Sequence, residues 1–223
     1  MNVYHLDTFP ELKEIFNQML STFQFLEVLS SDFKVFGTDE ETGWNIGRSK
    51  KYGFEIKYPS FISPSTTAPS SYLVGNDWTS RPEPNSKGEV IASFVICQFS
   101  DIPTAEPYHS FTSELRIGAS SDSNDIKNCL SFWNRTPVNI NINGIEFKRF
   151  KTYDAAKGHR ANVEVYRTIH NSFCFSIEKL EYGYLYDELE ISSSPHYNYE
   201  YSQKFNSCRK TVDQMFSTFR FLE

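Results

Sequence analysis

The chain lacks any long apolar run. None of its apolar stretches approaches the roughly twenty residues that a transmembrane helix needs. Residues 1–7 have neither a basic start nor an apolar stretch before a small-residue cleavage site. We therefore expect no direct membrane span and no signal peptide within this sequence.

Basic residues are also scarce. The chain has 22 Lys and Arg against 28 Asp and Glu, a net charge of −6. The longest basic cluster is Arg48-Ser49-Lys50-Lys51. Because binding to nucleic acid depends on neutralising phosphates, we expect neither a nucleic-acid partner nor an electrostatic membrane anchor.

The four cysteines form no CxxC motif and no Cys/His cluster, so the sequence predicts no metal site and no cofactor. An even number permits two disulfides in three connectivities but requires none. One candidate pair is Cys174–Cys208, if the last helix packs on the strand that carries Cys174. The cysteines are Cys97, Cys129, Cys174 and Cys208.

Aromatic residues, in contrast, are abundant, with 20 Phe and 13 Tyr. Because these residues favour strands, the composition indicates a protein rich in β-structure.

An internal repeat decides the expected domain organisation. Residues 17–27 match residues 213–223 at eight of eleven positions, at a constant offset of 196. In both copies an apolar stripe at helical spacing leads into an alternating Thr-Phe-x-Phe segment, which predicts a helix followed by a strand. The helix of the first copy has Thr8 as its expected N-cap and Pro10 in its first turn.

We therefore predict that residues 1–27 are the C-terminal helix and strand of a preceding repeat unit, and that residues 28–223 are the next unit. The alternative is one domain with two similar helices. A lone helix and strand exposes apolar surface, so we expect residues 1–27 to pack on the following domain or on a neighbouring chain.

Within the main unit, residues 54–58 alternate as a half-buried strand that Pro59 ends. Residues 60–88 are rich in Pro, Ser, Thr and Asn and predict a long loop. Residues 89–99 are apolar on both faces and predict a central strand. Asp122 or Ser123 is expected to cap a short helix.

Two hairpins follow. Asn143-Gly144 predicts a type I′ turn between alternating segments, and a second turn is expected at residues 170–172. The expected order is strand, loop, strand, helix, two hairpins, helix and strand. This predicts an α+β fold, an antiparallel sheet with helices packed on one face.

Three short motifs carry a family resemblance. Residues 52–59 (Tyr-Gly-Phe-Glu-Ile-Lys-Tyr-Pro), the Asn143-Gly144 hairpin and residues 217–221 (Ser-Thr-Phe-Arg-Phe) resemble PsbP-like domains of uncharacterised bacterial envelope proteins and lipoproteins. The likeness spans most of residues 50–223. It departs from the family at residues 60–62, where the family often has Trp, and it contains no lipid-attachment cysteine near the start. The resemblance implies an extracytoplasmic binding or scaffolding role, and it supplies no catalytic residues.

Three polar clusters were weighed as sites. His170 and Cys174 could form a nucleophile pair, but Cys174 between two phenylalanines is better explained as a buried residue. Asp122 and Asp125 could bind Ca²⁺, but helix capping explains them better. The turn at residues 157–160 could bind an anion through Arg160, although a solvated loop is the simpler explanation.

The Tyr-rich segment 182–201 is the strongest candidate surface. On an extended chain each trio of tyrosines would share one face. The rings could cover the sheet edge, form a protein interface or stack on a glycan. The two trios are Tyr182, Tyr184 and Tyr186, and Tyr197, Tyr199 and Tyr201.

The sequence thus predicts a non-catalytic extracytoplasmic binding or assembly module of a tandem-repeat envelope protein. Its expected partner is a protein or a neighbouring repeat, which would use segment 182–201 and loop 60–88. The alternative is a small-ligand or glycan receptor that uses the same tyrosines. A hydrolase is the third hypothesis, for which the sequence offers no constellation of nucleophile, base and oxyanion donors.

Overall fold

The computed structural model describes residues 32–69, 71, 73–82, 84–100, 110–132, 135–157, 159–183 and 195–222. Residues 32–223 form one compact unit. The helix, the strand and the packing expected for residues 1–27 lie outside the described residues, so they stay predictions.

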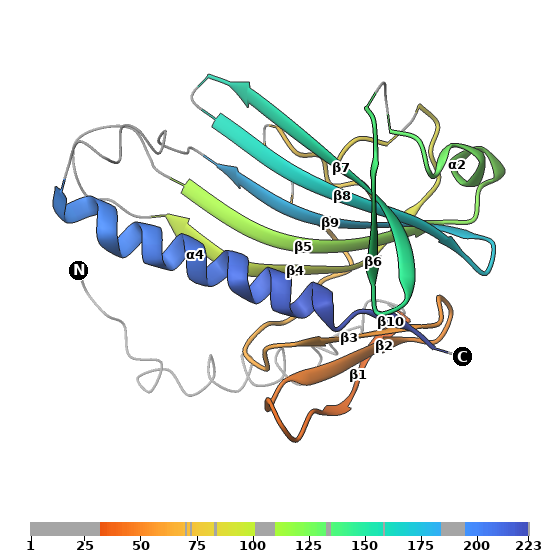
Figure 1. Cartoon of the computed structure of the whole chain (residues 1–223), viewed down its shortest axis with the longest axis horizontal. Helices are drawn as coiled ribbons and strands as arrows, with labels where there is room; N and C mark the ends of the chain where they lie inside the picture. The colour runs from red at the N-terminus through yellow and green to blue at the C-terminus, as the bar shows by residue number, and fades with distance from the viewer. Residues whose placement is uncertain are drawn as a thin grey trace, which may run out of the picture. The chain divides into compact units, whose positions relative to one another are not determined.

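The described chain is mostly β, with 51% strand and 14% helix, and forms two antiparallel sheets (Figure 1). The large sheet has the order β4 (Glu89–Ser100), β5 (Ser110–Ser120), β9 (Phe173–Gly183), β8 (His159–His170), β7 (Ile145–Ala156) and β6 (Val138–Ile142). The small sheet has the order β1 (Phe33–Thr38), β2 (Asn45–Ser49), β3 (Phe54–Tyr58) and β10 (Arg220–Phe221). The two helices are α2 (Ser123–Asn128) and α4 (Pro195–Ser217).

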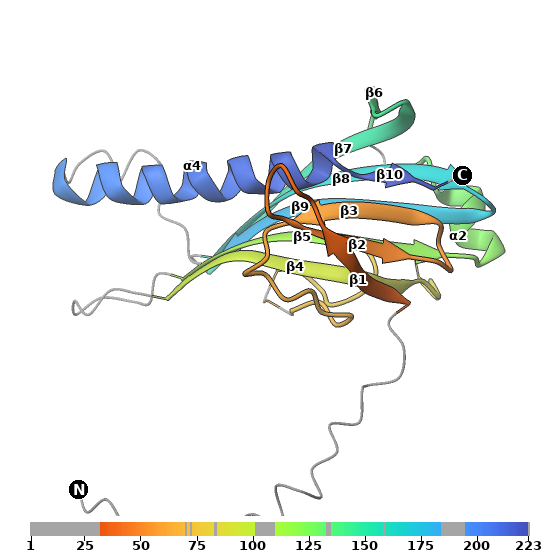
Figure 2. The same cartoon turned by 90° about the horizontal axis from the view of Figure 1, so that it is seen from below.

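One large apolar core joins the two sheets to α4. Figure 2 shows α4 and the two sheets from below. Strand β3 contributes Phe54 and Ile56, and β9 contributes Phe175 and Ile177, all without solvent exposure. Alternation along each strand brings these side chains to the same inner faces. Burial of aromatic and branched side chains of this size supplies the main stabilisation of the fold.

The C-terminal helix and strand close this core, as the sequence predicts. Met215, Phe216 and Phe219 are buried in it. Strand β10 pairs antiparallel with β3. A disulfide joins Cys208 of α4 to Cys97 of β4, with their Cα atoms 6.1 Å apart.

Both predicted hairpins are confirmed. Asn143 and Gly144 have φ angles of 51° and 81° between β6 and β7, as a type I′ turn requires. Asn171 and Ser172 take φ angles of 46° and 63° between β8 and β9. Strand β3 and the capped helix α2 also lie where they were predicted.

Strand β4 corrects one prediction, because it lies at the edge of the large sheet rather than in its centre. Strand β4 is apolar on both faces because other parts of the chain cover both faces. It does not have a neighbouring strand at each of its two edges. Residue Ser65 of the loop forms a bridge with Ser93, and two register shifts interrupt the pairing of β4 with β5. Both features protect an edge strand from further pairing.

The two helices do not cover one face of the sheet, so that part of the predicted fold class is not confirmed. Helix α4 packs on β3, β4 and β5. Helix α2 lies against the opposite face, where Cys129, directly after the helix, is bonded to Cys174 of β9. Cys174 and Phe175 point to opposite faces because they are adjacent in a strand.

Asn143 gives a first test, because its side chain links the first hairpin to the closing element. Its amide donates to the carbonyl oxygens of Ser217, at 2.6 Å, and of Phe219, at 2.9 Å. Asn143→Asp keeps a residue that tolerates positive φ but replaces the donor with an acceptor. We expect it to lower the free energy of unfolding by about 1–3 kcal/mol in urea denaturation.

The matched control is Asn171→Asp, at the same position of the second hairpin, where the amide contacts only the His170 ring. We expect that change to cost under about 1 kcal/mol. Equal losses in the two variants would contradict the role assigned to Asn143.

Candidate functional site

A charged groove lies beside α4, on the face of the large sheet that α4 covers. The helix packs on β4 and β5, and strands β9, β8 and β7 follow them in the sheet (Figure 1). The groove has a volume of about 520 Å³. Its polar and charged lining includes Lys151, Tyr153, Asn162, Glu164, Lys179, Glu181, Arg209 and Asp213.

Strand alternation explains why these side chains meet. Residues 175 and 177 of β9 lie on the α4 side and belong to the core, and residues 179 and 181 continue the same side. One face of β9 therefore changes from apolar to charged along its length. The apolar part holds the fold together, and the charged part forms the floor of the groove.

Three ion pairs line the groove. Lys151 bonds to Glu164 at 2.5 Å, across β7 and β8. Lys179 bonds to Asp213 of α4, also at 2.5 Å. Exposed pairs of this kind contribute about 0–1 kcal/mol each, so they contribute little to stability.

The third pair is bidentate. Arg209 of α4 donates from Nε and Nη2 to the two carboxylate oxygens of Glu181, at 2.7 and 2.9 Å. A fork of this kind fixes the orientation of both planar groups. With Arg135 also in the lining, the groove carries both signs of charge in near balance.

Tyr166 lies beside the groove, two residues after Glu164 on the same face of β8. Burial, followed by its hydrogen bond to Glu164, raises the pKa of the Tyr166 phenol, which stays a neutral donor. Burial opposes the ionisation of Glu164, but hydrogen bonds from Lys151 and Tyr166 outweigh it and lower the pKa of that carboxyl. The Lys179 ammonium lies 5.1 Å from the Tyr166 ring centroid. The arrangement suits a polar partner that offers both donors and acceptors.

Two of the residues predicted from sequence meet in a smaller pocket of about 270 Å³. Tyr182 and Arg160 both line it, together with His159. Tyr182 is only 4% exposed, and its hydroxyl donates to Glu114 at 3.2 Å. Burial, and then Glu114, raise the pKa of this phenol. Tyr182 is therefore a wall of the pocket and not a stacking platform on the surface.

The first predicted trio stays a prediction, and the second lies on a helix. Tyr184 and Tyr186 lie outside the described residues. Tyr197, Tyr199 and Tyr201 belong to α4 rather than to an extended segment. The extended backbone on which the single face of this trio depends is therefore not present there.

The cysteine predictions are corrected by the two disulfides. Cys174 is bonded to Cys129, with a Cα–Cα distance of 5.5 Å. Cys174 is therefore not bonded to Cys208, and it is not available as a nucleophile beside His170. The His170 ring instead stacks on Phe221, with centroids 3.7 Å apart, and burial lowers its pKa.

Of the acidic pair after β5, Asp122 caps the helix, as the simpler explanation predicts. Asp122 is the N-cap of α2 and accepts from the backbone N–H of Asn124. Asp125 is buried and accepts from the Ser120 hydroxyl at 2.5 Å and from the backbone N–H of Lys87. Within the described ranges, no three His, Cys, Asp or Glu side chains gather as a metal site would require.

The long loop is held down by a buried ionic network that the sequence reasoning missed. Arg116 and Glu178 face each other across β5 and β9, on the side away from α4. Glu178 accepts from the Thr79 hydroxyl and, at 2.8 Å, from the Ser80 backbone N–H. Arg116 donates to the carbonyl oxygen of Gly75 at 2.8 Å.

Glu114 completes the network and neutralises Arg116, to which it is bonded at 2.9 Å. Despite its burial, the pKa of Arg116 is raised, because hydrogen bonding and charge from Glu114 outweigh desolvation. Ser93 also donates to Glu114, at 2.8 Å. A buried charge without such partners would cost several kcal/mol, so each member requires the others.

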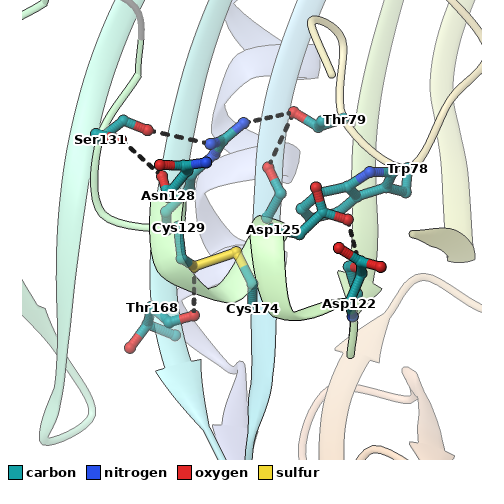
Figure 3. The surroundings of a disulfide bond; sticks show 12 residues. Trp78, Thr79, Asp122, Asp125, Asn128, Cys129, Ser131, Thr168 and Cys174 are labelled. Atoms are coloured by element: carbon teal, nitrogen blue, oxygen red, sulfur yellow. Dashed lines mark hydrogen bonds between the residues drawn. A yellow bond between two sulfur atoms is a disulfide. The ribbon is translucent and has the colours of Figure 1, made fainter. Parts of the chain in front are cut away.

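Close backbone contact brings the loop onto the sheet. A Cβ at Gly118 would lie 2.1 Å from the Trp78 carbonyl oxygen, so only glycine allows this approach. Figure 3 shows Trp78 and Thr79 beside the Cys129–Cys174 disulfide. Arg167 donates to the Ser131 carbonyl at 3.2 Å and to the Thr79 hydroxyl at 3.3 Å. The loop is thus a fixed cover of this face.

A signal for this network is present in the sequence. Residues 111–119 alternate apolar residues with Thr112, Glu114 and Arg116, but no strand was predicted there. Strand β9 likewise has a charged residue, Glu178, on the face opposite its residues of the large apolar core. When one face of a strand is apolar and the other carries charged residues, and both faces are covered, the charged residues form a buried polar layer.

Comparison with known proteins assigns no family. No protein-family model matches the chain, and no curated protein matches it. A crystal structure from Bacteroides thetaiotaomicron VPI-5482 is similar at a TM-score of 0.38 and 11% identity. The match covers 77% of this chain and 46% of that one, so the chain spans under half of that protein's length. Within the described residues, no helix is long and apolar enough to cross a membrane.

The network predicts a large effect of Glu178→Ala. The change leaves the Thr79 hydroxyl and the Ser80 N–H without their carboxylate acceptor in a buried layer, and it removes the negative charge opposite Arg116. We expect the free energy of unfolding to fall by about 3–5 kcal/mol. We also expect faster proteolysis within residues 71–88, measured by mass spectrometry of limited digests.

Glu181→Ala is the control, because Glu181 pairs with Arg209 in the open groove. We expect a loss of at most about 1 kcal/mol and an unchanged digest of the loop. A Glu178 variant as stable as this control would show that the network does not hold the loop.

Proposed function

We propose that the chain is a non-catalytic binding or assembly module that works in an oxidising, extracytoplasmic compartment. It is one PsbP-like unit of a tandem-repeat envelope protein. All four cysteines pair into two disulfides, which supports the oxidising compartment because such bonds persist there and are rare in the cytosol. The motifs at residues 52–59 and 217–221 support the family assignment.

The charged groove beside α4 is the observation that carries the binding role. Its ion pairs contribute little to stability, yet α4 and three strands present them together in one open hollow of about 520 Å³. Because the charges are nearly balanced, a strongly anionic or cationic partner gains little there. A protein surface of mixed charge can exchange ion pairs with Arg209 and Glu181 and stack on Tyr153, which is 54% exposed.

A second candidate is a small-ligand or glycan receptor. The pocket of about 270 Å³ that contains Tyr182, Arg160 and His159 favours it, since sugars bind where aromatic and polar groups converge. The burial of Tyr182 and its bond to Glu114 favour the groove and a protein partner instead.

A photo-crosslinking experiment tests the groove. A benzophenone amino acid replaces Tyr153 in the full chain, and the protein is irradiated in envelope extracts of its source cells. We expect one discrete protein adduct, which unlabelled wild-type chain competes away. The competitor Arg209→Glu should need at least about a tenfold higher concentration, because it repels Glu181 and disrupts the groove.

The control places the same probe at Phe61, which is 79% exposed and lies outside the groove lining. An adduct that the Arg209 variant competes as well as wild type would contradict binding in the groove. A saturable thermal shift with a glycan, lost in Tyr182→Phe, would favour the receptor instead.

A further inference from the structure

The end of the chain fills a defined slot between the two sheets. The slot is formed by β3, β4, β5 and the neighbouring core, and α4 and β10 occupy it. Five side chains of this closing element are each at most 4% exposed: Cys208, Val212, Met215, Phe216 and Phe219. A segment that fills the slot must therefore have apolar residues at these five positions.

The N-terminal segment has an apolar residue at every one of these positions. With the offset of 196, the five correspond to Leu12, Phe16, Met19, Leu20 and Phe23. The volumes also compensate, because the larger Phe16 replaces Val212 one turn away from the smaller Leu20, which replaces Phe216. Swaps that conserve total volume are the ones a packed core tolerates best.

One polar contact of the slot is matched as well, while the Arg220–Glu55 and Asp213–Lys179 ion pairs are not. The Thr218 hydroxyl accepts from the backbone N–H of Lys57 at 2.8 Å, and its counterpart is Thr22. Two of the three differences within residues 213–223 fall on exposed side chains. Asp213 is replaced by Asn17 and Arg220 by Gln24, and those side chains are 64% and 60% exposed.

We propose that the slot accepts residues 12–26 in place of residues 208–222, and that the partner of the N-terminal segment is therefore a second domain of this same fold. The slot of the domain described here is already filled by its own C-terminus. The second domain would be the neighbouring unit of the tandem repeat, so this inference rests on the tandem-repeat part of the proposed function.

One position distinguishes the two elements. Cys208 forms the disulfide with Cys97, and its counterpart Leu12 cannot form one. The second domain is then closed by packing alone at this point. The disulfide gives the C-terminal element a covalent bond to its own domain that the N-terminal element lacks.

A graft tests the proposal without any knowledge of the second domain. In the full chain carrying Cys97→Ser, residues 208–222 are replaced by the sequence of residues 12–26. The graft stops short of Pro10, which would fall inside α4. The matched control carries only Cys97→Ser and Cys208→Leu, so both proteins lack the disulfide.

We expect the graft to unfold cooperatively, with a midpoint within about 10 °C of the control and the same circular dichroism spectrum. A graft that stays unfolded while the control folds would overturn the proposal. A second graft that also carries Phe219→Asp must be unfolded, and a folded one would show that the slot does not require apolar residues at these positions. These readouts report folding alone, so they fail independently of the crosslinking test for the groove.

Discussion

The packing of the C-terminal helix and strand between the two sheets is the contact on which the rest of the structure depends. The Phe219 ring lies 5.2 Å from Phe54 of the small sheet and 6.3 Å from Phe147 of the large one, centroid to centroid. Phe216 adds a contact at 4.4 Å with Tyr166. Without these rings the inner faces of both sheets would be partly exposed, and the loss of that apolar burial would be a large fraction of the stability of a typical domain.

The position of α4 also determines which part of the large sheet is left as an open groove. Because the helix covers β4 and β5 but not the charged continuation of β9, it leaves a groove and supplies one wall of it through Arg209 and Asp213. The opposite face is closed by the loop, which Glu178 and Arg116 hold through buried hydrogen bonds. The large sheet thus has one face that the loop closes and one face that carries the open groove.

Local signals in the sequence were sufficient for the features that depend on a few adjacent residues. Asn143-Gly144 predicted its turn because positive φ angles restrict the residue type, and the Thr-Phe-x-Phe repeat predicted β10. Strands β1, β2 and β5 were missed. In β5 the second face carries Glu114 and Arg116, whose partners lie in distant loops and strands. The edge position of β4 and the cysteine pairing likewise depend on contacts between distant segments, which periodicity does not encode.

Disulfide mapping tests the arrangement of the closing element most directly. The protein is alkylated, digested without reduction, and its linked peptides are sequenced by mass spectrometry. The structure predicts Cys97 linked to Cys208 and Cys129 linked to Cys174. These links place α4 and α2 on opposite faces of the large sheet. A Cys174–Cys208 peptide would place α4 on the face assigned to the loop, and it would contradict the account.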